Sequence, residues 1–108
     1  MCGRGLFGAA ALLAAASVCA AQARFSADAI DKGREQYNRT CRQCHGHNMV
    51  NAGTTVFDLR KFPTDQPDRF KQSVMHGKGA MPSWRESLTP EQIEWLWAYV
   101  GSRGGKEP

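Results

Sequence analysis

The strongest constraint on this chain is the pentapeptide Cys-Arg-Gln-Cys-His at residues 41–45. A Cys-x-x-Cys-His run is the arrangement that attaches c-type haem covalently. One turn of helix brings both thiols to the two vinyl edges of a single porphyrin, and the next residue can then offer its imidazole to the iron. We therefore expect Cys41 and Cys44 to carry one haem c through thioether bonds, with His45 as an axial ligand of the iron.

Two other chemistries also start from Cys-x-x-Cys. A structural zinc site needs four ligands, and apart from His47 the sequence offers no good partner for the two cysteines. A thioredoxin-like dithiol is expected after a strand, within a βαβ unit, whereas the segment before Cys41 has a helical pattern. Haem is the favoured interpretation, and zinc and dithiol chemistry are the alternatives.

The amino-terminal 1–23 segment has the features of a secretory signal peptide. One basic residue, Arg4, precedes an apolar run over residues 6–16, and Ala21-Gln22-Ala23 fits a small-x-small cleavage site. The apolar run is short for a membrane span. We predict cleavage after Ala23, a mature haem domain over residues 24–108 in the periplasm, and no stable membrane insertion.

Cleavage would leave the mature chain with few means of stabilising itself. Cys2 and Cys19 would leave with the signal peptide, so that only Cys41 and Cys44 remain and no disulfide framework is available. In a domain this small, an apolar core is only marginally sufficient for stability. We therefore expect folding and haem attachment to be coupled.

Three helical stretches separated by loops predict an all-α domain. The first runs over residues 26–40 with Ser26 as N-cap, and the second runs over residues 67–76. The third follows Thr89, which can form a capping box with Gln92. Gly101 is the expected stop of this helix, with a frayed tail after it. No stretch has convincing strand alternation.

Gly33 falls in the middle of the first predicted helix, on the same face as Ile30 and Tyr37. Glycine costs stability inside a helix, so this position needs a structural reason. Close approach of another helix is the simplest one. We predict that the first and last helices cross at Gly33.

A haem iron with one histidine needs a second axial ligand or an open face, and this choice separates electron carriers from enzymes and gas binders. The candidates are Met49, Met75, Met81, His47 and His76. Met81 is favoured because glycines before it and Pro82 after it let its loop reach the far side of the ring. His76 and an open site are the alternatives to Met81.

Three stretches resemble class I cytochromes c in their short bacterial periplasmic form: residues 41–46, Gly79-Ala80-Met81-Pro82-Ser83-Trp84 and Leu96-Trp97-Ala98-Tyr99-Val100. The resemblance implies the cytochrome c fold, in which three main helices and loops wrap around one covalently attached haem. It also implies that His45 and Met81 are the axial pair, and that the activity is one-electron transfer without enzymatic bond chemistry.

A shorter resemblance concerns the partners. Phe57-Asp58-Leu59-Arg60-Lys61-Phe62 and Asp68-Arg69-Phe70 are similar to small cytochromes that accept electrons from pyrroloquinoline-quinone-dependent alcohol dehydrogenases. This implies a dehydrogenase as electron donor and a terminal oxidase as acceptor, with a quinol complex as the alternative donor. We expect a monomer, and no binding of nucleic acid, because basic residues are interspersed with acidic ones. The rival functions are a haem protein that binds or senses a small molecule and a cytochrome subunit of a larger redox enzyme.

The sequence departs from the family pattern at one point. Many class I members carry Gly-Pro-x-Leu after the haem motif, and the proline carbonyl accepts a hydrogen bond from the axial histidine. Residues 51–59 contain no proline. Another backbone carbonyl must therefore accept the Nδ1 proton of His45, and such bonds tune the basicity of the ligand.

Overall fold

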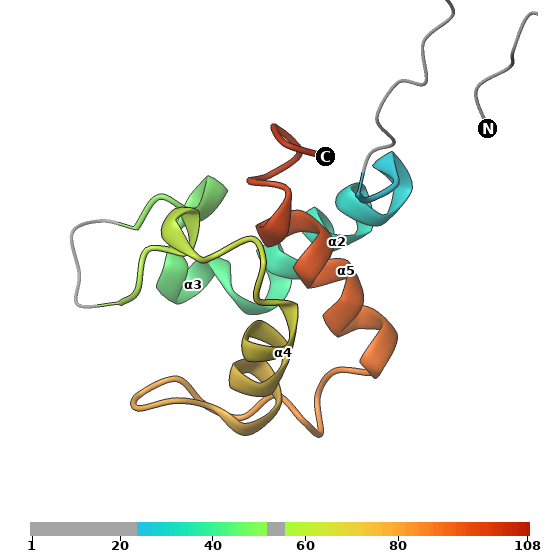
Figure 1. The fold of residues 1–108 in the computed structure, drawn as a ribbon. Helices are drawn as coiled ribbons and strands as arrows, with labels where there is room; N and C mark the ends of the chain where they lie inside the picture. The colour runs from blue at the N-terminus through green and yellow to red at the C-terminus, as the bar shows by residue number, and fades with distance from the viewer. Residues whose placement is uncertain (1–23, 52–55) are drawn as a thin grey trace, which may run out of the picture.

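The computed structural model describes residues 24–51 and 56–108, so the predicted signal peptide lies outside the described residues. These residues contain no strand and form helices α2 (Ala27–Thr40), α3 (Arg42–His45), α4 (Pro67–His76) and α5 (Pro90–Gly101), with 3-10 turns η1 (His47–Met49) and η2 (Leu59–Lys61) (Figure 1). The predicted all-α class is confirmed, and α2, α4 and α5 are the three expected helices. None of the described helices is long and apolar enough to cross a membrane.

The long helices begin and end where local sequence signals place them. Ser26 caps α2 by accepting a hydrogen bond from the backbone N–H of Ala29 at 3.0 Å. At the start of α5, Thr89 and Gln92 form the predicted capping box, with donor–acceptor distances of 2.9 and 3.1 Å. Gly77 ends α4 with a φ of 79°, a conformation that favours glycine.

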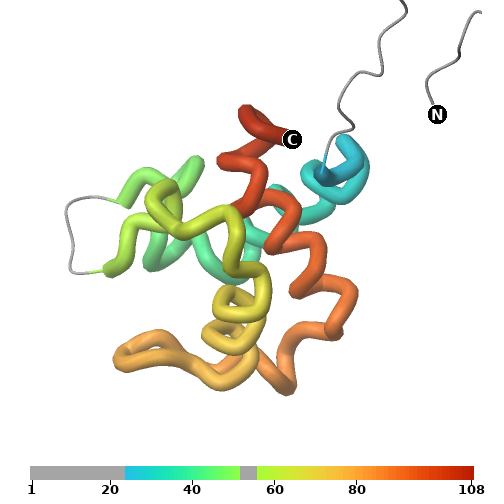
Figure 2. Tube along the Cα trace, viewed as in Figure 1, coloured from blue at the N-terminus to red at the C-terminus, as the bar shows by residue number. Residues whose placement is uncertain are grey.

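Helices α2 and α5 cross at Gly33, as predicted. A Cβ atom on Gly33 would lie 2.0 Å from the carbonyl oxygen of Trp95 and 2.9 Å from Cβ of Tyr99. Further along the crossing, the rings of Tyr37 and Tyr99 pack with their centroids 5.0 Å apart. Figure 2 shows the α5 trace passing across α2. Only glycine allows the two backbones to approach this closely.

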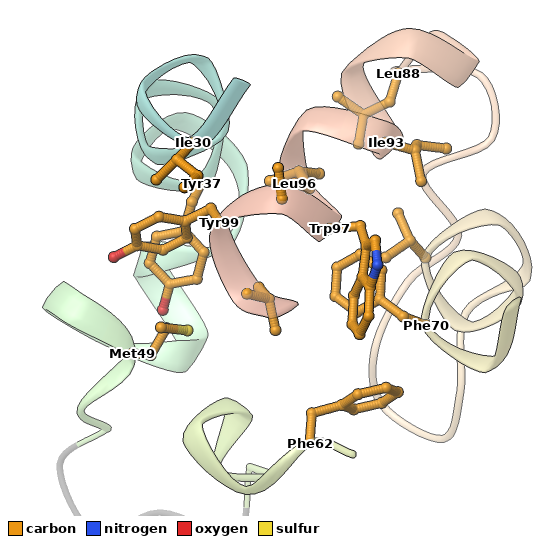
Figure 3. Packing of buried hydrophobic residues seen from close by; sticks show 13 residues of the cluster. Ile30, Tyr37, Met49, Phe62, Phe70, Leu88, Ile93, Leu96, Trp97 and Tyr99 are labelled. Atoms are coloured by element: carbon orange, nitrogen blue, oxygen red, sulfur yellow. The ribbon is translucent and has the colours of Figure 1, made fainter. Parts of the chain in front are cut away.

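Trp97 of α5 joins segments that are far apart in the chain. Its ring centroid lies 5.2 Å from that of Phe70 in α4, 5.9 Å from that of Phe62 after η2, and 6.3 Å from that of Phe25. Figure 3 shows Trp97, Phe70 and Phe62 gathered on one side of α5 and the Tyr37–Tyr99 pair on the other. This cluster holds α4 and the η2 turn against α5, and so positions the loops on either side of α4.

The chain after α5 is ordered, and the expectation of a frayed tail was wrong. Gly101 is still helical, and the buried Ser102 follows it. The Ser102 hydroxyl donates to the carbonyl of Tyr99 at 3.2 Å and accepts from the backbone N–H of Gly105 at 2.9 Å. A single serine carries no distinctive signal in the sequence, so the role of Ser102 in fixing the chain after α5 becomes clear only from its contacts in the structure.

Candidate haem site

The two cysteines of the motif lie at the junction of α2 and α3. The backbone N–H of Cys41 donates to the carbonyl of Tyr37 at 2.8 Å, which ends α2, and α3 begins at the next residue. Cys41 is partly buried, Cys44 is exposed, and both are free thiols. Burial raises the pKa of the Cys41 thiol above its ordinary value. The residues thus have the free thiols that two thioether bonds require.

His45 closes α3, and a backbone carbonyl fixes its ring. Nδ1 of His45 lies 3.1 Å from the carbonyl oxygen of Phe57. A carbonyl can only accept, so Nδ1 carries the proton and Nε2 keeps the lone pair that a metal needs. Burial lowers the pKa of His45, and the hydrogen bond to Phe57 opposes this shift. The imidazole is therefore neutral at pH 7 and suited to bind iron.

Phe57 supplies the backbone carbonyl whose identity the sequence left open. In Phe57-Asp58-Leu59 it stands where the family pattern Pro-x-Leu has its proline. Because the acceptor is a main-chain oxygen, any residue with the right backbone direction can provide it. The leucine two positions later was the signal in the sequence that could have located this carbonyl.

Tyr37 connects α2 to the turn that follows the motif. Its hydroxyl donates to the carbonyl of Gly46 at 2.6 Å. Gly46 has a φ of 90°, and a Cβ atom there would lie 2.0 Å from the carbonyl oxygen of Val50. Burial raises the pKa of Tyr37 far above its ordinary value. The tyrosine therefore stays protonated and keeps its hydrogen bond well into the alkaline range.

Replacing Tyr37 with Phe is expected to lower the free energy of unfolding by about 1 kcal/mol at pH 7, because the partly buried carbonyl of Gly46 loses its donor. The raised pKa means that the folded chain holds the phenolic proton more tightly than the unfolded chain does. The contribution of the protonated Tyr37 to the free energy of unfolding is fully present below about pH 10, and it is lost as the pH rises toward the folded-state pKa of Tyr37.

Urea titrations of wild type and Tyr37→Phe at pH 7 and at pH values above about 10 test this. Tyr99→Phe is the matched control, because no hydrogen bond of its hydroxyl is found among the described residues, and it should cost less at pH 7. If Tyr37→Phe keeps the full alkaline loss of stability, another group is responsible for that loss.

Met81 lies in a closed turn beyond α4. Lys78 and Met81 exchange two backbone hydrogen bonds, each 3.0 Å long. A Cβ atom on Gly77 would lie 2.6 Å from the carbonyl oxygen of Met81, so the turn packs tightly against the end of the helix. The Met81 side chain is partly buried and packs against the hydrophobic core. In Figure 1 this loop and α3 both extend to the left of α5, with the loop below.

Two further hydrogen bonds fasten the Met81 loop to α4. The Ser83 hydroxyl donates to the carbonyl of Met75, and the backbone N–H of Trp84 donates to the carbonyl of Val74 at 2.9 Å. Both acceptors belong to the last turn of α4, where carbonyls have no partner within the helix. The loop is therefore held at both of its ends.

The other candidate ligands have simpler roles in the structure. His47 and His76 are exposed. Met49 is 2% exposed and lies beside the rings of Tyr37 and Tyr99 (Figure 3). Met75 is partly buried against the core, as a gap-filling side chain would be. Met81 stays the predicted ligand.

The described part of the chain also bears on the two alternatives to haem. It contains no group of three His, Cys, Asp or Glu side chains that could hold a metal ion, so it offers no structural zinc site. A thioredoxin-like pair would follow a strand, whereas Cys41 follows α2. A helical domain with two free thiols, a neutral histidine and a thioether on a separate loop is the arrangement of a covalently bound haem protein.

Comparison with known proteins leads to the same class. Residues 28–100 match the family model described as "Cytochrome C oxidase, cbb3-type, subunit III". The chain is 38% identical over 86 residues to cytochrome c6 of Gloeothece citriformis, covering 76% of this chain and 77% of the relative. It is 37% identical over 79 residues to cytochrome c6 of Nostoc sp., covering 69% and 70% of the two chains.

A further relative is quinohemoprotein alcohol dehydrogenase ADH IIB of Pseudomonas putida, 34% identical over 77 residues, or 68% of this chain but only 11% of the relative. No solved structure shows a significant match. The chain belongs to the class I c-type cytochromes. Its cofactor is covalently attached haem c, its class of activity is electron transfer, and its partners are redox proteins.

Proposed function

We propose that residues 24–108 form a periplasmic one-electron carrier, not an enzyme. Cys41 and Cys44 would hold one haem c through thioether bonds, and His45 and Met81 would bind its iron. The haem supplies the one-electron couple. The chain's own residues hold the two ligands, exclude competing ligands and bury the charged centre.

The closed turn at Met81 is the observation that carries this proposal. The backbone of Met81 is fixed at Lys78, and its loop is fastened to α4 through Ser83 and Trp84. The Met81 thioether can therefore stay bound to the iron in both oxidation states. Little then rearranges during electron transfer. A thioether is a soft, neutral ligand that raises the potential compared with a second imidazole. Burial of the charged ferric centre acts in the same direction, so we expect a positive reduction potential.

We propose a pyrroloquinoline-quinone-dependent alcohol dehydrogenase as the donor and a terminal oxidase as the acceptor. The resemblance of residues 57–62 to cytochromes with such donors supports the first assignment. Similarity to part of a quinohemoprotein alcohol dehydrogenase supports it as well. Contacts with both partners are brief in this proposal, as suits a monomer that shuttles between them.

We also propose that signal peptidase cleaves after Ala23. The residues just beyond this site belong to the folded body, which supports a boundary there. Arg24 donates to the carbonyl of Thr64 at 2.7 Å, and Phe25 packs edge-on against Trp97.

Optical spectra of wild type and Met81→Ala test the ligation. Ferric wild type is expected to show the weak sulfur-to-iron charge-transfer band at the near-infrared edge, and its ferrous form should not bind carbon monoxide. Met81→Ala should lose the band, bind carbon monoxide and have a lower reduction potential. Met75→Ala is the matched control, since it removes a thioether from the same region and should keep the band.

One outcome would change the assignment of the sixth iron ligand. A wild type that lacks the band and binds carbon monoxide has an open or labile sixth position, and the small-molecule-binding function takes over.

The donor is tested on the same samples by adding a pyrroloquinoline-quinone-dependent dehydrogenase and its alcohol. Rapid reduction of the ferric wild type supports the proposed donor, and no reduction excludes it.

A further inference from the structure

Asp58 follows directly after the residue whose carbonyl binds His45, and its carboxylate closes a tight turn. Oδ1 of Asp58 accepts from the backbone N–H of Arg60 at 3.0 Å and from Nε of Arg60 at 2.9 Å. Oδ2 accepts from Nη2 of Arg60 at 2.8 Å. The hydrogen bonds from Arg60 lower the pKa of Asp58 to about 2, so the carboxylate is charged at pH 7.

This turn is anchored in the core at its far end. The backbone N–H of Lys61 donates to the carbonyl of Asp58 at 2.9 Å, and that of Phe62 donates to the carbonyl of Leu59 at 3.2 Å. The Phe62 ring lies within the Trp97 cluster and also meets the ring of Phe57 edge-on at 6.2 Å. The turn therefore has a fixed base, and Asp58 is the side chain that caps its start.

The direction of the Phe57 carbonyl depends on this cap. The carbonyl shares a rigid peptide plane with the nitrogen of Asp58, so any rotation of the backbone at Asp58 swings the oxygen. On the other flank, the Asn51 amide donates to the carbonyl of Val56 at 3.1 Å. The plane between Phe57 and Asp58 is thus held from both sides.

We infer that Asp58 is a positioning residue for the axial histidine. By capping the turn it aims the Phe57 carbonyl at Nδ1 of His45, and so sets the strength of that hydrogen bond. A strong bond increases the basicity of the imidazole and stabilises ferric iron, so Asp58 acts on the reduction potential without touching the haem ligand. This inference rests on the proposed ligation of iron by His45.

The test compares two variants of equal charge in the holoprotein. Asp58→Ala and Asp58→Ser both remove the carboxylate, but serine keeps an oxygen that can cap the backbone N–H of Arg60. Asp31→Ala controls for the loss of a surface charge, because Asp31 forms an exposed ion pair with Arg34 in α2. The readouts are the midpoint potential and, by NMR of the ferrous protein, the solvent exchange rate of the His45 Nδ1 proton.

Asp58→Ala is expected to raise the potential and to speed exchange of the Nδ1 proton roughly 2- to 10-fold, the effect of weakening one hydrogen bond. Asp58→Ser should recover much of both effects, and Asp31→Ala should leave the exchange rate unchanged. Equal values for Asp58→Ala and Asp58→Ser, or values that match those of Asp31→Ala, overturn the positioning role.

Two further results keep the test decisive. If Asp58→Ala yields no holoprotein, Arg60→Met replaces it, because it removes two of the three hydrogen bonds that hold the Asp58 carboxylate in its capping position. Faster solvent exchange of the His45 Nδ1 proton in this variant then supports the inference, and an unchanged exchange rate overturns it. If wild type itself shows no iron-bound His45, the proposed ligation fails and the inference falls with it, whereas normal wild-type ligation with unaffected variants rejects the inference alone.

Discussion

Gly33→Ala is expected to lower the free energy of unfolding by about 3 kcal/mol or more. Helix propensity alone predicts the opposite sign, since Ala inside a helix is more stable than Gly by about 0.5–1 kcal/mol. The added Cβ atom would lie 2.0 Å from a backbone oxygen of α5, which cannot move without separating the two helices. The clash costs more free energy than the better helix propensity of Ala provides, so the substitution should destabilise the protein.

Urea titration of the ferric holoprotein measures this effect, and Gly79→Ala is the matched control. A Cβ atom on Gly79 would meet nothing within 4 Å, so that only its φ of 58° opposes the change. The control should lose about 1 kcal/mol, the cost of left-handed backbone for a residue with a side chain. A Gly33→Ala protein as stable as wild type would show that the helices do not cross as closely as described.

The double substitution Cys41→Ala and Cys44→Ala is expected to abolish covalent haem and, with it, the cooperative fold. No residue of α3 is buried, so this helix adds little to the hydrophobic core that could hold it in place without haem. Its end is held by the hydrogen bond from His45 to Phe57, and the turn after it by the bond from Tyr37 to Gly46. Since small domains are stable by only about 5–15 kcal/mol, loss of a cofactor that binds the folded state alone is enough to unfold them.

Haem staining after denaturing electrophoresis and far-ultraviolet circular dichroism report the two losses separately. Met81→Ala serves as control, because it keeps both thioether bonds and should stay folded. A haem-free double variant that unfolds at the same urea concentration as wild type would show that attachment and folding are independent.

The sequence predicted those features that depend on neighbouring residues. The caps at Ser26 and Thr89 act within one turn of helix, so local pattern was enough to place the starts of α2 and α5. Gly33 was informative because glycine in mid-helix is unfavourable unless another backbone comes close. The motif at residues 41–45 identified the cofactor because its spacing is a geometric requirement of the porphyrin.

The missed features depend on contacts between distant backbone groups. A carbonyl carries no side-chain signature, so only the leucine two positions later pointed to the acceptor at Phe57, and its role became clear only from the contact with His45. The same holds for Ser102, whose contacts follow from how α5 ends. Asp58 was part of a recognised stretch, but its role became visible only once its three hydrogen bonds to Arg60 were known.

The crossing of α2 with α5 also imposes an order of events on the growing chain. The motif follows α2 immediately, whereas the helix that packs on α2 is the last one in the chain. A chain that emerges amino terminus first therefore exposes its cysteines long before Trp95 and Tyr99 are available to cover Gly33. Contacts between such distant segments form late. Haem can therefore be joined to an open chain before the final helix packs onto α2.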